Sequence, residues 1–362
     1  MAAGDFSASQ MPLVLLKQNR IFLGGARVNS QRNDSRLQTV KAVLENQTAR
    51  PIPVMTGREC TGVKITWLKA CDESVVDCAD ELFTAVCDIT GPEIESVAET
   101  LPNNLCLSKS FTVTDDECND LFTYEDKMAE ALLNAKFQIE KELSERILAA
   151  MYAELFPASS YPGEEPPGWD LSGNPYLYPG DPALRPLTLS QMYVITQVNN
   201  IVNPIVIGDG TWQADQIVAQ SGNNNGGMVY NEASLFNQWG KWYFDPVSLM
   251  AVGDGVGKLL RFDPNNVILW SKNDVDHTDV RPFGDGDKYS WKEPSLYLKY
   301  KNGTPIYYDA WMQLACVIGV NNRRRLAAKV QLIFTGGFAV GPATCVTGDT
   351  GILYFEQVTP TT

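Results

Sequence analysis

One uninterrupted helical pattern, between Thr123 and Phe156, constrains the fold of this chain more than any other feature of the sequence. Apolar residues recur there at steps of three and four, as on the buried face of an amphipathic helix: Met128, Leu132, Ala135, Ile139, Leu143, Ile147 and Ala150. No Gly or Pro interrupts the pattern before Pro157. A helix of about 32 residues would be about 48 Å long, against an average of about 11–12 residues in globular proteins. We therefore expect a strut that runs along one side of a domain.

The ends and the polar side of this segment also fit a helix. Thr123 and Asp126 resemble a capping box, and Glu142 and Arg146 have the spacing of a favourable i,i+4 ion pair. We expect the charged residues on the opposite, solvent-exposed face: Lys127, Glu130, Lys136, Glu140, Lys141, Glu145 and Glu154. A coiled coil is the alternative, but the pattern covers only about four heptads and its seam contains two alanines.

Charge is distributed unevenly along the 362 residues. The chain has 29 Lys and Arg against 43 Asp and Glu, a net charge of −14, which disfavours a dedicated nucleic-acid-binding protein. Residues 1–50 carry seven basic and three acidic residues, whereas residues 59–99 carry ten acidic and two basic ones. Residues 1–50 have little apolar periodicity after Leu23. We therefore expect them to form an arm that has no core of its own. The arm either stays a floppy tail or becomes ordered on the acidic surface of another chain.

Residues 57–114 have the pattern of strands. Val63, Ile65 and Trp67 alternate with polar residues, and residues 110–114 predict a second strand with Phe111 and Val113 on one face. Few large apolar residues lie between these strands. We expect a long, hairpin-like excursion that has no self-sufficient core.

The remaining sequence predicts a mixed α/β region followed by terminal strands. Residues 157–186 form a loop rich in Pro and aromatic residues, which we expect to be rigid. Helices are expected over residues 188–202, 215–220 and 231–244. Strands are expected over residues 204–207, 248–252, 258–262, 267–270, 296–300, 307–316, 328–334 and 352–357.

No motif in the sequence identifies an enzyme, a cofactor or a metal site. The single histidine, His277, limits schemes that need a histidine base or ligand. The segment from Gly253 to Lys258 resembles a phosphate loop, but its glycine spacing is wrong and Leu259 occupies the position of the magnesium-binding Ser or Thr. We interpret it as a glycine turn. The acidic residues around His277 lack the spacing of a calcium loop, so a solvated loop is favoured: Asp274, Asp276, Asp279, Asp285 and Asp287.

The cysteines leave the redox state open. Six of the eight lie in one stretch: Cys60, Cys71, Cys78, Cys87, Cys106 and Cys118. No C-x-x-C pair occurs, which disfavours zinc. Reduced thiols are favoured, and disulfides that form after the protein leaves a reducing cytosol are the alternative. The longest early apolar stretch, residues 11–16, is far too short to span a membrane.

This order of parts resembles the major capsid proteins of tailed double-stranded DNA bacteriophages. The closing run from Gly336 to Phe355 is similar to the ends of such proteins. The resemblance implies an α+β, HK97-like capsid fold. Its parts would be an N-terminal arm (1–56), an extended loop (57–114), the spine helix with part of the peripheral domain (115–186), an axial domain (187–310), and C-terminal strands that return to the peripheral domain (311–362).

The resemblance also implies a structural, non-enzymatic function. Copies would assemble in the host cytoplasm into hexamers and pentamers of an icosahedral virion head. The partners would be other copies, the portal and other head proteins, and packaged double-stranded DNA only weakly, with no membrane. Another virion protein, an encapsulin-type shell and a carbohydrate-active hydrolase are the alternatives.

The candidate residues for contacts between subunits come from four segments: the basic arm, the excursion, the long helix and an arginine tract that precedes a strand. The tract would meet either DNA phosphates or a neighbour's acidic residues, and we favour the second. The candidates are Arg20, Arg27, Arg32, Arg36, Trp67, Lys69, Glu142, Arg146, Arg323, Arg324 and Arg325.

Overall fold

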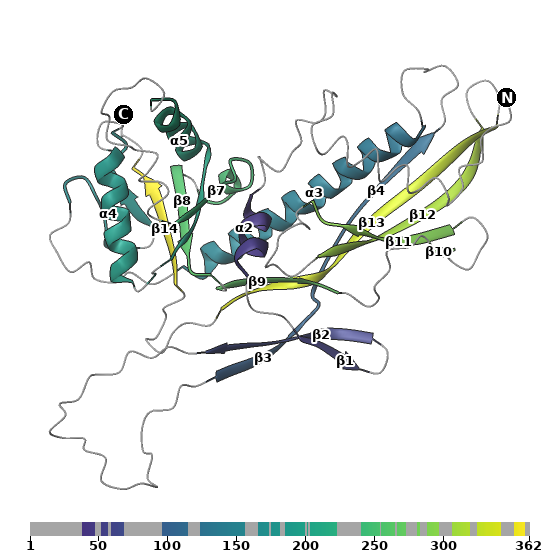
Figure 1. Ribbon diagram of the computed structural model, residues 1–362, viewed down its shortest axis with the longest axis horizontal. Coiled ribbons are helices and arrows are strands. Elements are labelled where there is room, and N and C mark those ends of the chain that lie inside the picture. Colours follow the sequence, from purple (N-terminus) through teal and green to yellow (C-terminus); the bar gives the residue numbers. More distant parts are fainter. Residues whose placement is uncertain are drawn as a thin grey trace, which may run out of the picture.

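The chain has a mixed α+β fold in which one long helix lies along a long antiparallel sheet (Figure 1). A computed structural model describes residues 38–47, 52–56, 59–68, 96–114, 124–155, 166–173, 175–181, 185–199, 201, 203–222, 240–253, 255–264, 266–272, 281–282, 288–296, 306–318, 324–341 and 351–358. The helices in these ranges are α2 (Thr39–Asn46), α3 (Tyr124–Ala153), α4 (Arg185–Val198) and α5 (Gly210–Gly222), with a 3-10 turn, η6 (Leu249–Ala251). No helix in the described ranges combines the length and the apolar character needed to cross a membrane.

The large sheet has the order β10-β11-β12-β13-β4 and is antiparallel throughout. Its strands are β4 (Leu105–Thr114), β10 (Arg281–Pro282), β11 (Lys288–Pro294), β12 (Tyr307–Ile318) and the 17-residue β13 (Arg324–Val340). A further strand, β9 (Val267–Ser271), pairs with the C-terminal end of β13. Strand β13 thus pairs with three other strands, β12, β4 and β9.

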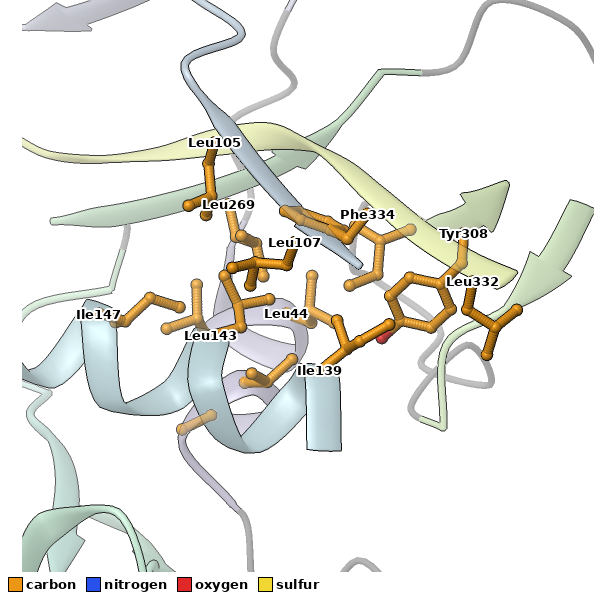
Figure 2. Packing of buried hydrophobic residues seen from close by; sticks show 14 of the residues in the cluster. Leu44, Leu105, Leu107, Ile139, Leu143, Ile147, Leu269, Tyr308, Leu332 and Phe334 are labelled. Carbon is orange, nitrogen blue, oxygen red and sulfur yellow. The ribbon is translucent and has the colours of Figure 1, made fainter. Parts of the chain in front are cut away.

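The predicted long helix is confirmed as the 30-residue α3, which packs on one face of this sheet. The alternation expected in β13 is also confirmed, because Val330, Leu332 and Phe334 are fully buried. They meet Ile139 and Leu143 of α3 in one core (Figure 2). Burial of this face, rather than helix propensity, holds so long a helix in place.

A second lobe is built on a five-stranded sheet of order β5-β14-β8-β6-β7. Its strands are β5 (Tyr176–Tyr178), β6 (Ile205–Gly208), β7 (Lys241–Phe244), β8 (Val256–Phe262) and β14 (Ile352–Gln357). Ile205 and Ile207 of β6 face the main core with α2 and α3, whereas Val206 faces a second core with α4 and α5. Both faces are therefore covered, which explains the continuous apolar runs of its central strands.

The excursion forms a three-stranded sheet from β1 (Ile52–Thr56), β2 (Glu59–Leu68) and β3 (Ser96–Pro102). The alternation expected in β2 is confirmed, since Val63 and Ile65 are buried and Lys64 and Thr66 are exposed. The buried pair packs on β9 in a small cluster that includes Ile268 and Trp270. The expected second strand, residues 110–114, lies instead within β4 of the large sheet.

Within the stretch expected to be an arm, α2 is a helix that the sequence did not predict. Val40, Ala42, Val43 and Leu44 are buried in the main core. The sheets also cross the other expected boundaries: β9 to β11 join the large sheet although they precede residue 311, and β14 joins the second lobe. Residues 1–37 lie outside the described part of the chain.

Two further predictions were wrong. Residues 241–244 of the expected helix 231–244 form β7, because they pair in parallel with β6 after Gly240, whose φ of +126° does not suit a right-handed helix. Residues 248–252, expected as a strand, contain η6. The helices expected over residues 188–202 and 215–220 are confirmed as α4 and α5, with shifted ends.

Candidate assembly surfaces

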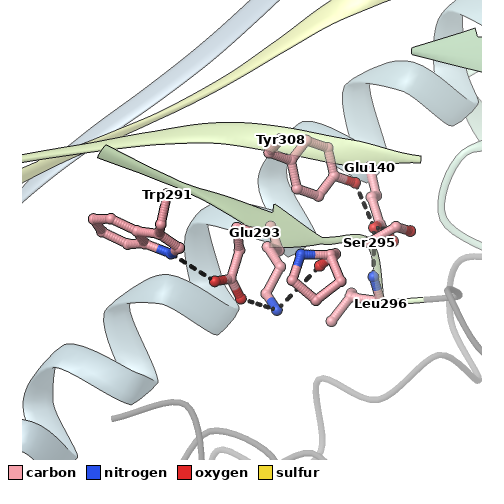
Figure 3. Close-up of polar contacts among 8 residues, drawn as sticks. Glu140, Trp291, Glu293, Ser295, Leu296 and Tyr308 are labelled. Carbon is pink, nitrogen blue, oxygen red and sulfur yellow. Dashed lines mark hydrogen bonds and ion pairs between the residues drawn. The ribbon is translucent and has the colours of Figure 1, made fainter. Parts of the chain in front are cut away.

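A buried polar cluster fastens the middle of α3 to the large sheet (Figure 3). The Lys136 ammonium donates a hydrogen bond of 2.7 Å to Oε1 of Glu293 on β11, and both side chains are almost completely buried. The other oxygen of Glu293 accepts a hydrogen bond of 3.0 Å from the indole of Trp291. Such a pair favours one position of α3 along the sheet, because a shift of the helix would leave each charge buried without its partner.

Glu140, one turn along α3, is the second centre of this cluster. Its Oε1 accepts hydrogen bonds from the Tyr308 hydroxyl (2.5 Å), the Ser295 hydroxyl (2.8 Å) and the Leu296 amide (2.9 Å). Its Oε2 has no partner among the described residues. Burial raises the pKa of this carboxyl, although the three donors and Lys136 oppose the shift.

The expectation that Lys136 and Glu140 face solvent was wrong. Both are buried, together with Ser144, next to the apolar stripe of α3. A signal was present in the sequence, since Ala129, Lys136, Glu140 and Ser144 follow one another at helical steps beside that stripe. The partners of Lys136 and Glu140, on β11, just after it and on β12, lie more than 150 residues away, so helical periodicity alone could not identify them.

Asp245 joins α2 to the second lobe. Its Oδ2 accepts hydrogen bonds from the Thr39 hydroxyl (2.7 Å) and the Thr39 amide (3.2 Å) at the start of α2. Its Oδ1 accepts one from the Ser248 amide (2.8 Å). Burial raises the pKa of this carboxyl against these donors. The start of α2 is thus fixed by a residue 206 positions later in the chain.

The glycine segment, expected as a turn between two strands, follows the 3-10 turn η6 and runs into β8, which already contains Gly257 and Lys258. Gly253 and Gly257 adopt φ of +66° and +63°. The Lys258 ammonium is buried and donates hydrogen bonds to the carbonyl oxygens of Gly253 (2.8 Å), Met250 (3.4 Å) and Val252. Because these carbonyls already bind it, this lysine is not available to hold a phosphate.

The predicted contact residues fall into three groups. Glu142 and Arg146 form the expected ion pair on the exposed side of α3, at 2.8 Å. Trp67 lies in β2 opposite Val97, and Arg324 and Arg325 begin β13 opposite Ile318 and Val317. The other candidates lie outside the described ranges: Arg20, Arg27, Arg32, Arg36, Lys69 and Arg323. The part of the Pro-rich loop before residue 166 and the acidic residues around His277 also lie outside them.

Of the grouped cysteines, the structure describes the side chain of Cys106, which is exposed and free, as is Cys316 on β12. Cys60 lies in β2, whereas Cys71, Cys78, Cys87 and Cys118 lie outside the described residues. No cluster of three or more His, Cys, Asp or Glu suited to a metal ion occurs in the described part of the chain.

Several exposed apolar side chains remain on the second lobe, outside the two cores. On α4 they are Leu187, Val194 and Val198, and on α5 they are Ile217 and Val218. In η6 and at the first position of β8 they are Met250 and Val256. These groups, together with the exposed faces of the three-stranded sheet, are the candidate surfaces for contacts between copies.

Solved phage structures resemble the chain over most of its length. The capsid structure of Cyanophage P-SCSP1u matches at 8% identity and a TM-score of 0.39, over 87% of each chain. A structure from Mycobacterium phage Adephagia matches at 12% identity and a TM-score of 0.40, over 88% of this chain and 91% of that one. The mature capsid of bacteriophage PhiM1 matches at 8% identity and a TM-score of 0.36, over 82% of each.

No family model matches the sequence, and no curated protein matches it either. The resemblance is thus to solved phage capsid structures.

Proposed function

We propose that this chain is the major capsid protein of a tailed double-stranded DNA bacteriophage, a shell subunit without enzymatic activity. Copies would form hexamers and pentamers of an icosahedral head in the host cytoplasm and would reside in the virion. The partners would be further copies, the portal and other head proteins, and the enclosed DNA only weakly.

The observation that carries this proposal is the small apolar cluster that joins the described side chains of the three-stranded sheet to the rest of the chain. The three-stranded sheet packs on the rest of the molecule through a cluster of Val63, Ile65, Ile268 and Trp270, with Leu101 and Ala339 at its edge. Ile52, Lys64 and Thr100 share the opposite face, and all three are exposed. A sheet with so little core of its own gains stability when a neighbouring subunit covers it.

The remaining architecture supports the same function. In an HK97-like shell subunit, α3 would be the spine helix and the large sheet the peripheral domain. The lobe around β6 and β8 would be the axial domain, the three-stranded sheet the extended loop, and residues 1–37 the arm. The basic arm and the acidic stretch 59–99 provide the charge complementarity that contact between copies requires.

Negative-stain electron microscopy of the purified full chain tests this proposal. We expect shells, tubes or ring-shaped capsomers. A chain that remains monomeric at high concentration, or that hydrolyses glycans, would contradict it. An encapsulin-type shell would instead be distinguished by a cargo enzyme inside the particles.

A further inference from the structure

Arg261 on β8 carries a completely buried guanidinium in the second lobe. It lies opposite Val206 of β6 and Leu353 of β14, on the side of the sheet that α4 covers. Its Nη1 donates a hydrogen bond of 2.8 Å to the hydroxyl of Thr196 on α4. Its Nε and Nη2 have no hydrogen-bond partner among the residues that the structure describes. This is unusual, because a buried charge in a protein is normally paired.

The surroundings of Arg261 replace a counter-charge only in part. The ring centre of Phe355 lies 5.9 Å from the guanidinium carbon. Thr196 stands in the last turn of α4, where the helix dipole favours a cation. Burial lowers the pKa of Arg261 to about 9, and Tyr193 is the one described group that opposes this shift. The guanidinium is therefore charged at neutral pH, and no described carboxylate compensates its charge.

The two free nitrogens of Arg261 define the ligand that fits there. Nε and Nη2 present two N–H groups along one edge of the guanidinium plane, and this edge matches two oxygens of one carboxylate or phosphate group. The side chains on this face of the sheet are apolar: Val206, Leu259, Leu353 and Phe355. Hydrogen bonds are stronger in such surroundings than in water. An oxyanion thus complements the free edge of Arg261 in both charge and geometry.

We propose that Arg261 binds an oxyanion that presents two oxygens to Nε and Nη2, either a small anion from solution or a carboxylate of a second copy. The net charge of −14 gives each copy an excess of carboxylates. Because both nitrogens are buried, the anion enters when α4 moves outward from the sheet. Apolar packing of Leu189, Met192 and Ile195 holds α4 there. This site would exist whether or not the chain builds a shell.

Thermal unfolding of the full chain in sodium acetate or sodium phosphate, compared with sodium chloride of equal ionic strength, tests for a small anion. We expect the melting temperature to rise by at least about 2 °C and to saturate with anion concentration, because a ligand of the folded state stabilises it. Arg261→Met removes the two N–H groups and should lose this rise. Arg146→Met, on the exposed side of α3, is the matched control and should keep it. A general salting-out effect of phosphate would be equal in both variants.

A second variant, Thr196→Val, leaves Arg261 in place and removes the hydrogen bond that orients it. We expect it to bind the anion about threefold to tenfold more weakly.

A carboxylate of a second copy would give a different result. The melting temperature would then rise with protein concentration and not with acetate or phosphate, and Arg261→Met would again lose the rise. An equal rise in Arg261→Met and Arg146→Met, or undiminished anion binding by Thr196→Val, would overturn the inference. So would a melting temperature of the unaltered chain that depends on neither the anion nor the protein concentration.

Discussion

At the scale of single residues, the buried carboxyl of Glu140 contributes to the dependence of stability on pH. Burial raises its pKa in the folded chain above the ordinary value of 4.5. The folded state therefore binds a proton that the unfolded state releases. The stabilisation from this group is fully present at low pH and is lost as the pH rises through the folded pKa.

Replacing Glu140 with Gln should remove that pH dependence. The amide oxygen can still accept hydrogen bonds from Tyr308, Ser295 and Leu296, but it does not titrate. We expect the free energy of unfolding of Glu140→Gln, relative to the unaltered chain, to increase as the pH rises above the ordinary value of 4.5. Urea unfolding at several pH values measures it. Glu142→Gln, on the exposed side of α3, is the control, and an equal slope in both variants would argue against a titrating Glu140.

The Lys136–Glu293 pair makes a second prediction at this scale. Glu293→Gln leaves the Lys136 ammonium in the core without its counter-charge, so we expect a loss of about 3–5 kcal/mol in the free energy of unfolding. Replacing both residues, as Lys136→Met with Glu293→Leu, should recover most of that loss, because the stranded charge is removed. Denaturant unfolding of the three chains decides this. A double variant less stable than Glu293→Gln would show that the pair itself is indispensable.

At the scale of elements, stability depends on α2 more than its length of eight residues suggests. Leu44 is buried in the main core, so Leu44→Ala should lower the free energy of unfolding by about 2–5 kcal/mol. Ile318→Ala removes a similar side chain that is 73% exposed, and it should change stability by less than about 0.5 kcal/mol. Equal effects in thermal or urea unfolding would show that α2 does not belong to the core.

The sequence predicted those elements whose pattern lies within one segment. Helix α3 and strand β13 have long stretches of clear periodicity, and both were found. Helix α2 was missed because eight residues give little periodicity and its capping partner, Asp245, is distant in the chain. Strand β7 was mistaken for a helix because its partner β6 lies more than 30 residues away.

The candidate surfaces divide in the same way: contacts between residues close in sequence could be predicted, and exposure that depends on distant elements could not. The Glu142–Arg146 pair follows from helical spacing and was found. The outward stripe of α4 cannot be recognised from the sequence, because the residue type alone does not show whether an apolar side chain faces a core or solvent. Only the position of the five-stranded sheet shows that Val194 and Val198 face away from the core while Met192 faces it.

At the scale of the whole molecule, residues 1–37 and the rest of the chain have opposite net charge. Residues 1–37 contain five basic and two acidic residues, so removing them changes the net charge of the chain from −14 to −17. The remaining residues retain both cores, α2 included. Attraction between copies would therefore lose its basic component while the fold of each copy is preserved.

A chain that begins at residue 38 tests whether the arm acts in assembly or in folding. We expect it to unfold at the same urea concentration as the full chain, because no described core residue is removed, but not to form closed shells in negative stain. A chain that begins at residue 48 also lacks α2 and should unfold at lower urea. Since the proposed contact of the arm is electrostatic, salt above about 0.5 M should weaken assembly of the full chain, as screening shortens to a few ångströms. Closed shells from the chain that begins at residue 38 would show that residues 1–37 are dispensable for assembly, and that the contacts between copies lie in the folded lobes.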